Sequence, residues 1–222
     1  MAAQGRRRTV RVTGPPTPDI TVVAFNTPEG WHAGYSAAES LPLGTTIIPA
    51  YEKAGGLQPV EIPPATKMNV DGAGASWWFL GGRWWGETLP DGAVALLVKF
   101  VGPPSPLVPS GINLTVRTPI DQTAGPLEAA EVKDGQMYFR VKPEYAGYPP
   151  AVSFLGRHVS VEQGKFMVGE KLYSTRATPP EGEDFHGEDV PFAVCVWKTY
   201  PSVSECSTRL FDIPLAGTGS GN

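Results

Sequence analysis

The sequence predicts an all-β protein, built as an antiparallel sandwich or a jelly-roll-like arrangement with very little helix. Glycine and proline are frequent, with 26 and 24 in 222 residues, and they lie without a period between apolar runs, as turns between short strands do. Helical signal is confined to residues 34–40 and 50–54, where we expect short helices in connections. Segments rich in β-branched and aromatic residues recur at 20–25, 45–48, 76–80, 93–101, 112–118, 137–141, 151–155, 159–161, 165–168, 192–199 and 203–213.

Turn dipeptides divide several of these predicted strands into hairpins. Asp134-Gly135 is the dipeptide that type I′ turns favour, and it lies between two β-rich segments. Loops this short permit only antiparallel pairing, so we expect meanders of antiparallel strands. Three further dipeptides are predicted to act in the same way: Gly81-Gly82, Asp91-Gly92 and Gln163-Gly164.

The chain is long enough for one large β-domain or for two smaller units. Residues 102–111 (GPPSPLVPSG) are the best candidate for a boundary, because proline fixes φ and cannot donate to a sheet ladder. A hinge at residues 119–126 is equally compatible, and a long connection inside one sandwich is the alternative to any division. We place the parts as follows: a flexible arm at 1–12, a first β unit at 13–118, a second at 119–216 and a flexible tail at 217–222.

Tryptophan is concentrated in one predicted hairpin at residues 76–87. With Gly81-Gly82 as its turn, Trp77 and Trp84 share one face, with Phe79, and Trp78 pairs with Trp85 on the other. Each ring buries about 150–250 Å² in a folded protein, so at least one face needs cover. We favour packing in the core or between subunits. The alternative is a binding platform for a sugar ring or a partner surface, formed by Trp77, Trp78, Trp84 and Trp85.

The N-terminal arm carries Arg6, Arg7 and Arg8, which can neutralise RNA phosphates without any fold. The net charge of −4 gives no overall attraction to nucleic acid, and a solubilising terminus explains the arginines equally well. Carboxylates gather at residues 181–190 without the spacing of a known calcium loop, so we expect a solvated loop. We predict no metal and no cofactor.

Cys195 and Cys206 are the 2 cysteines of the chain, too few for a disulfide framework or a zinc site. They flank a predicted turn near Tyr200-Pro201, and a hairpin there would bring them opposite one another, so a cross-strand disulfide is geometrically possible. Two buried thiols are the alternative, and the one that we favour.

Catalytic sequence patterns are absent, and we expect no enzyme. The chain contains neither G-x-S-x-G, H-E-x-x-H, Walker A nor C-x-x-C, and its 3 histidines lie in no triad context. No apolar run is long enough to cross a bilayer, and no secretory signal is recognisable at the start. Asn113-Leu114-Thr115 fits the N-glycosylation sequon, but it falls in a predicted strand without a leader, so we discount it.

The layout of the chain resembles that of capsid proteins of small non-enveloped RNA viruses, in particular a protein with a protruding surface domain. The shared features are the start GRRRTVRV, the all-β content with high Gly and Pro, the long apolar strand AVALLVKFV, a Pro-rich hinge and a further β-rich unit. The resemblance implies a homo-oligomer at the virion surface, attachment to a glycan or protein receptor, and no catalytic residues. A carbohydrate-binding β-sandwich module that uses the tryptophans is the second hypothesis, and a glycoside hydrolase fragment is the third.

Overall fold

The computed structural model describes residues 20–27, 30–37, 40–56, 58–61, 68–69, 76–80, 89, 91–106, 109–154, 157–179, 186–199 and 203–214. Over these residues the chain forms strands and two 3-10 turns, and no α-helix. The all-β prediction is therefore confirmed. The elements are β1 (Ile20–Thr27), β2 (Gly30–Ala37), β3 (Thr46–Lys53), β4 (Val60–Glu61), β5 (Met68–Asn69), β6 (Ser76–Leu80), β7 (Ala93–Gly102), β8 (Ile112–Pro119), η2 (Gln122–Ala124), β9 (Leu127–Lys133), β10 (Gln136–Val141), η3 (Pro143–Tyr145), β11 (Pro150–Phe154), β12 (Arg157–Val159), β13 (Val161–Val168), β14 (Lys171–Ala177), β15 (Gly187–Thr199) and β16 (Val203–Ile213).

Three sheets make up the described fold. A nine-stranded sheet has the order β12-β11-β15-β16-β8-β7-β3-β4, with β5 also on β3; a three-stranded sheet has the order β1-β2-β6; a four-stranded sheet has the order β13-β14-β10-β9. Every ladder between described strands is antiparallel except that of β8 with β16, which pair in parallel from Thr115↔Val203 to Arg117↔Glu205. Purely antiparallel meanders are therefore not the whole fold. More than 80 residues separate β8 from β16 along the chain, so no short loop dictates their direction.

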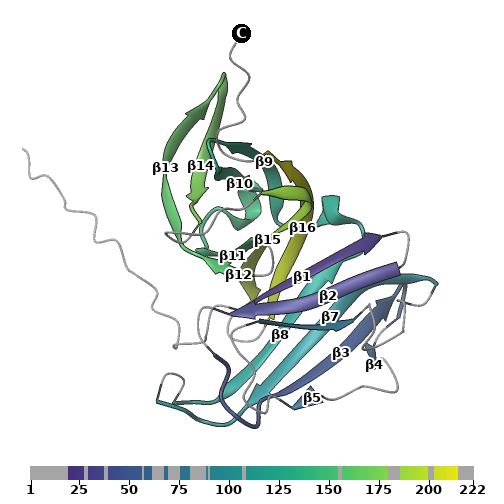
Figure 1. Ribbon diagram of the computed structural model, residues 1–222. Helices are drawn as coiled ribbons and strands as arrows, with labels where there is room; N and C mark the ends of the chain where they lie inside the picture. Colours follow the sequence, from purple (N-terminus) through teal and green to yellow (C-terminus); the bar gives the residue numbers. More distant parts are fainter. Residues whose placement is uncertain are drawn as a thin grey trace, which may run out of the picture.

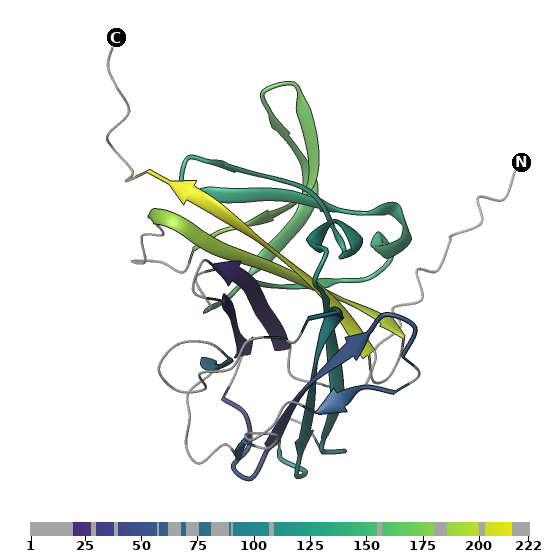
Figure 2. The ribbon, with the colours of Figure 1, turned by 90° about the vertical axis from the view of Figure 1, so that its right-hand side faces the viewer.

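The two smaller sheets cover opposite faces of the large sheet, as the side chains of β15, which point alternately to the two faces, show. Cys195 belongs to a core cluster that includes Val22, Phe100 and Leu114 under the three-stranded sheet. Its neighbours Val194 and Val196 belong to a second cluster under the four-stranded sheet. Figures 1 and 2 show β15 and β16 as a long hairpin running between the two halves of the molecule. Both cores therefore depend on this hairpin.

The β15–β16 hairpin is tied to both halves by buried polar contacts as well. The backbone N–H of Ala24 on β1 donates to Thr208 Oγ1 at 3.1 Å, and the N–H of Leu127 on β9 donates to Ser207 Oγ at 3.0 Å. These two hydroxyls on β16 accept hydrogen bonds from the backbones of β1 and β9, and neither of these strands forms a ladder with β16. Each buried donor is thereby satisfied.

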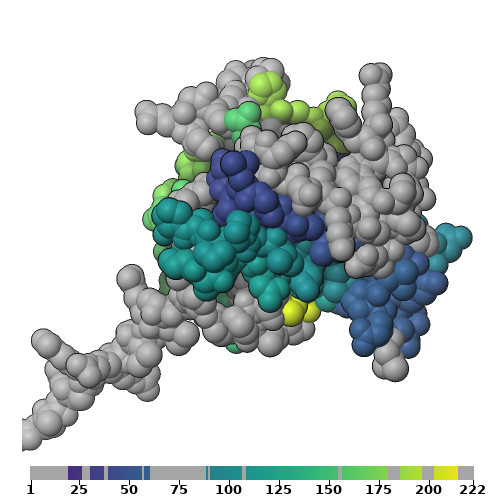
Figure 3. All heavy atoms as spheres, turned by 90° about the horizontal axis from the view of Figure 1, so that it is seen from below, coloured from purple at the N-terminus to yellow at the C-terminus, as the bar shows by residue number. Residues whose placement is uncertain are grey.

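Residues 102–111 form a hairpin loop, so their assignment as a candidate boundary is wrong. β7 and β8 pair directly on either side of the loop, from Gly102↔Ile112 to Ala95↔Pro119. The prolines keep the loop out of the ladder, as expected, but the chain returns along the same sheet. Seen from below in Figure 3, this loop (teal) lies beside the turn that precedes β3 (dark blue). The nine-stranded sheet also continues past residue 119, because β8 pairs with β16.

The two expected short helices are strands instead. Residues 34–37 belong to β2, which lies between β1 and β6, and residues 50–53 belong to β3, which lies between β7 and the short strands β4 and β5. A strand with partners on both sides gains ladder hydrogen bonds that a short isolated helix lacks. Weak local propensity is overridden by that pairing.

Turn chemistry predicts one hairpin correctly and misplaces another. Asp134 and Gly135 both have positive φ, 51° and 70°, between Lys133↔Gln136, as a type I′ turn requires. Gln163-Gly164 lies instead within β13, at a bulge between Gln163 and Phe166. The real turn is Gly169-Glu170, where Gly169 has a φ of 58°. The segment before Asp91-Gly92 and the Gly81-Gly82 dipeptide lie outside the described residues.

Candidate functional site

The predicted tryptophan hairpin is only partly within the described residues. β6 carries Trp77 and Trp78, and its backbone pairs with β2 in the register Tyr35↔Trp77 and Gly34↔Trp78. The predicted partner strand, with Trp84 and Trp85, lies outside the described residues, as do Arg6, Arg7 and Arg8 of the arm. The hairpin, its two faces and the arm therefore stay predictions.

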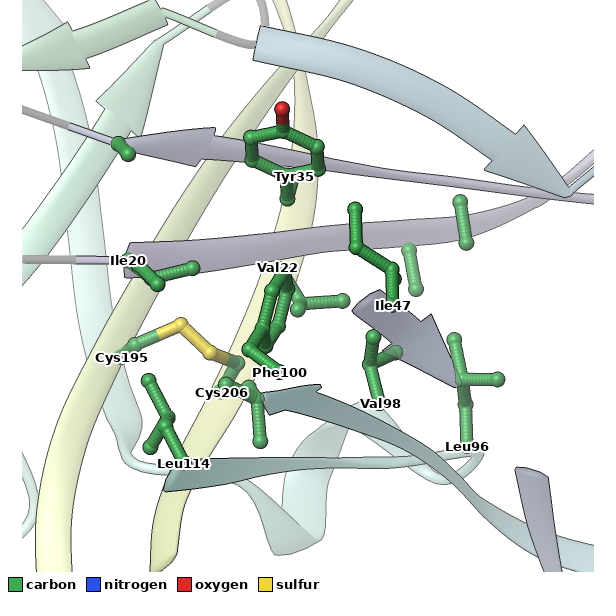
Figure 4. Packing of buried hydrophobic residues seen from close by; sticks show 14 of the residues in the cluster. Ile20, Val22, Tyr35, Ile47, Leu96, Val98, Phe100, Leu114, Cys195 and Cys206 are labelled. Carbon is green, nitrogen blue, oxygen red and sulfur yellow. A yellow bond between two sulfur atoms is a disulfide. The ribbon is translucent and has the colours of Figure 1, made fainter. Parts of the chain in front are cut away.

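Cys195 and Cys206 form a disulfide across β15 and β16, which corrects our preference for free thiols. The two residues stand directly opposite in the antiparallel register, with their Cα atoms 4.0 Å apart. Both are buried, and Figure 4 shows the bond inside the first core cluster near Ile20 and Leu114. The sequence placed the cysteines on one hairpin, but only the register of that hairpin brings the sulfurs together.

Two exposed large apolar side chains lie together on the hairpin of β13 and β14. In Figures 1 and 2 this hairpin extends beyond the rest of the four-stranded sheet, of which β13 is the edge strand. Met167 and Leu172 stand opposite one another beside the turn, and they are 62% and 46% exposed. Large apolar side chains at the end of a projecting hairpin are typical of a contact surface. We call these two residues the tip pair.

Arg140 on β10 holds the tip end of β14 in place. Its guanidinium donates from Nη1 to the carbonyl oxygen of Leu172 at 2.8 Å, and it lies 5.7 Å from the centre of the Tyr173 ring. Arg140 Nε also donates to Glu128 Oε2 at 3.2 Å. A planar guanidinium can stack on a ring and donate in its own plane at the same time, which a lysine cannot do. The arginine therefore couples β9, β10 and β14.

Glu131 on β9 adds a second tie to β14. Its Oε2 accepts hydrogen bonds from Tyr173 Oη at 2.8 Å and from Lys171 Nζ at 3.2 Å. These donors favour the carboxylate form and lower the pKa of Glu131 below its usual value. Burial, together with the bond to Glu131, raises the pKa of Tyr173, so both partners keep the protonation states that the bond needs near neutral pH.

Farther from the tip, Arg176 on β14 covers the ring of Phe166 on β13. The guanidinium lies 5.0 Å from the ring centre and forms an ion pair with Glu162. On β13 itself, a β-carbon at Gly164 would lie 3.1 Å from Phe166 Cζ, so the ring lies close against the glycine backbone. The centre of the Tyr138 ring on β10 lies 5.9 Å from the centre of the Phe166 ring. Phe166 is thus a packed ring and not an open platform for a ligand.

The free edge of β13 is built to resist further strand pairing. Glu162 and Lys165 are exposed on it, and the bulge between Gln163 and Phe166 interrupts the regular ladder. Charged side chains and bulges are the features by which edge strands avoid adding another strand. Contacts made by this hairpin are accordingly expected through the side chains of the tip pair.

A partly buried polar network lies where β8, β16 and η3 meet. Tyr145 Oη donates a hydrogen bond to Glu205 Oε2, while Arg117 Nη1 lies 4.0 Å from Glu205 Oε1. Arg117 also donates to Glu52 Oε2 on β3 from both Nε (3.0 Å) and Nη2 (2.9 Å). Burial, followed by the bond to Glu205, raises the pKa of Tyr145. Each of these groups is engaged by another protein group, so we interpret the network as structural.

The described residues include no group of three or more His, Cys, Asp or Glu side chains placed to hold a metal ion. Nor does any helix in the described part of the chain have the length and apolar character needed to span a membrane.

Sequence reasoning missed the tip pair and its supports because the turn was placed at Gln163-Gly164. Gly169, which follows the apolar residues 166–168, is the signal that could have found the true turn. No pattern of neighbouring residues in the sequence predicts the roles of Arg140, Arg176 and Glu131, because their partners lie on other strands.

The sequence matches no known protein-family model, and no curated protein is detectably similar to it.

Proposed function

We propose that this chain is a structural and interaction protein, of the capsid or surface-protrusion type, that associates with copies of itself and makes contacts through the β13–β14 hairpin. The observation that carries the proposal is the tip pair. Met167 and Leu172 expose large apolar surface, side by side, at the end of a projecting hairpin. Apolar surface presented in this way gains free energy when a partner covers it.

The rigidity of the hairpin supports the same proposal. Arg140 stacks on Tyr173 and Arg176 stacks on Phe166, while Glu131 and Glu162 hold the flanking cations. A side chain that is ordered before binding loses less conformational entropy when the partner arrives.

The test is the oligomeric state at increasing protein concentration, measured by sedimentation velocity. We expect the wild-type chain to associate, and the double variant Met167→Ser with Leu172→Ser to associate at least about tenfold more weakly, which is about 1.4 kcal/mol. Leu43→Ser is the matched control, because Leu43 is 67% exposed in the turn before β3, away from the hairpin. We expect this control to associate like the wild type.

Two outcomes would overturn the proposal. A wild-type chain that is strictly monomeric at high concentration rules out self-association. Equal weakening by Leu43→Ser and by the double variant would remove the hairpin from the contact. A tryptophan fluorescence change on titration with glycans, lost in Trp84→Ala, would instead favour the carbohydrate-binding module.

A further inference from the structure

Asn113 on β8 has a different environment from the one that its place in a strand suggests. The sequon is Asn113-Leu114-Thr115, and alternation puts Asn113 and Thr115 on one face of the sheet with Leu114 on the other. Leu114 is 1% exposed in the first core cluster, whereas Asn113 is exposed and Thr115 is half-buried. The two side chains that define the sequon therefore face outward together, and only the middle residue is needed for packing.

Among the described residues, the side chains beside Asn113 on its face of the sheet are exposed. Its partner across the β7–β8 ladder is Val101, which is 40% exposed, and Lys99 opposite Thr115 is exposed as well. The ladder between β8 and β16 covers only Thr115 to Arg117, so Asn113 lies beyond the end of that pairing. A substituent on the Asn113 amide would extend from this face without displacing a core side chain.

The disulfide indicates where such a chain folds. Cys195 and Cys206 are 2% and 0% exposed, so the bond has to form before or during folding, while the sulfurs can still be reached. Disulfides form in oxidising compartments. In eukaryotic cells the same secretory compartment carries out glycosylation of Asn-X-Thr sites. This observation is independent of the sequon and of its exposure.

We propose that Asn113 is an acceptor for an N-linked glycan. In the transfer, Asn113 Nδ2 forms a bond to the anomeric carbon of the first sugar of a lipid-diphosphate-linked oligosaccharide. The bond from that carbon to the diphosphate oxygen breaks, the lipid diphosphate leaves with the bonding electrons, and the amide nitrogen loses one proton. The glycan then lies over the outer face of β7 and β8, beside Val101 and Lys99.

The test is expression of the full chain behind a secretory leader in eukaryotic cells, with intact-mass analysis of both the secreted and the cell-associated luminal protein. We expect a mass increase by a whole glycan that peptide N-glycosidase removes, with conversion of Asn113 to Asp. Asn113 is the only asparagine of the chain with Ser or Thr two residues later, so the site is unambiguous. We expect Asn113→Gln and Thr115→Val to abolish the increase and Thr115→Ser to keep it.

A luminal wild-type chain that carries the Cys195–Cys206 disulfide and an unmodified Asn113 would overturn the proposal. Measuring the cell-associated pool prevents poor export from concealing the result. Serine at position 115 keeps the sequon, whereas valine removes it. Loss of the glycan in Thr115→Ser as well as in Thr115→Val would therefore show that the change at Thr115 acts through folding and not through the sequon, and it would also contradict the proposal.

Discussion

Tyr145 in η3 donates its hydroxyl hydrogen to the buried carboxylate of Glu205 on β16. Glu205 stands in register with Arg117 on the parallel strand β8, so this carboxylate lies at the one parallel ladder of the described fold. The ion pair of Arg117 with Glu52 then extends the network to β3. A continuous row of polar contacts thus links η3, which lies between β10 and β11 in the chain, to β16, β8 and β3 of the large sheet.

We expect Tyr145→Phe to lower the free energy of unfolding by about 1–3 kcal/mol, because it removes the hydrogen bond that the hydroxyl donates to a buried carboxylate. The measurement is urea-induced unfolding at neutral pH. Tyr138→Phe is the matched control, since it removes a hydroxyl that donates to Gln136 on a half-exposed surface. We expect the control to lose less than about 1 kcal/mol, and equal losses in the two variants would contradict the role assigned to Glu205.

The same hydroxyl predicts the behaviour of the protein at alkaline pH. The folded state raises the pKa of Tyr145 above the value of about 10 found in unfolded chains. Above pH 10 the unfolded chain releases this proton first, so the stability contributed by Tyr145 is complete below pH 10 and declines as pH rises further. We expect the stability difference between wild type and Tyr145→Phe to shrink above pH 10. A difference independent of pH from 8 to 11 would contradict this.

Loss of the disulfide should destabilise the protein without changing its fold. We expect the double variant Cys195→Ala with Cys206→Ala to lose about 2–4 kcal/mol of unfolding free energy. The measurement compares urea-induced unfolding of wild type and variant, and then of wild type with reductant present. Alkylation of two thiols in unreduced, denatured wild-type protein would show that the bond does not form.

Gly125 gives a test of packing between η2 and β16. A β-carbon there would lie 2.5 Å from Ser207 Cβ and 3.1 Å from the carbonyl oxygen of Cys206. We therefore expect Gly125→Ala to cost about 1–3 kcal/mol, as overpacking does. Gly147→Ala is the matched control, because nothing lies within 4 Å of its added carbon. The measurement is thermal unfolding of both variants. A Gly125→Ala variant as stable as the wild type would contradict the close contact.

Much of the strand content could be predicted because it depends on neighbouring residues. The apolar run of β7 alternates between the core and the outer face, and Asp134-Gly135 forms the turn that its backbone preferences favour. Residues 34–37 were misjudged because Gly34, Ser36 and Ala37 carry little local preference for a strand. Their strand exists because β1 and β6 pair with it.

The candidate site was harder to predict than the strands. The predicted turn was Gln163-Gly164, whereas the chain turns at Gly169-Glu170, after the end of β13. The bulge of β13, with the ring of Phe166 packed against Gly164, decides the matter, since it keeps the first dipeptide inside the strand. Arg140 and Tyr173 meet across two strands, and no spacing along the chain predicts such a contact.

By itself the sequence determined the all-β class, most of the strands, the type I′ turn at Asp134-Gly135 and the placing of both cysteines on one hairpin. The tertiary structure decided the parallel pairing of β8 with β16, the disulfide, the hairpin loop at residues 102–111 and the projecting tip pair. The physical reason is the range of the interactions. Backbone preference and alternation act between neighbours, whereas strand order, register and burial depend on residues far apart in the chain.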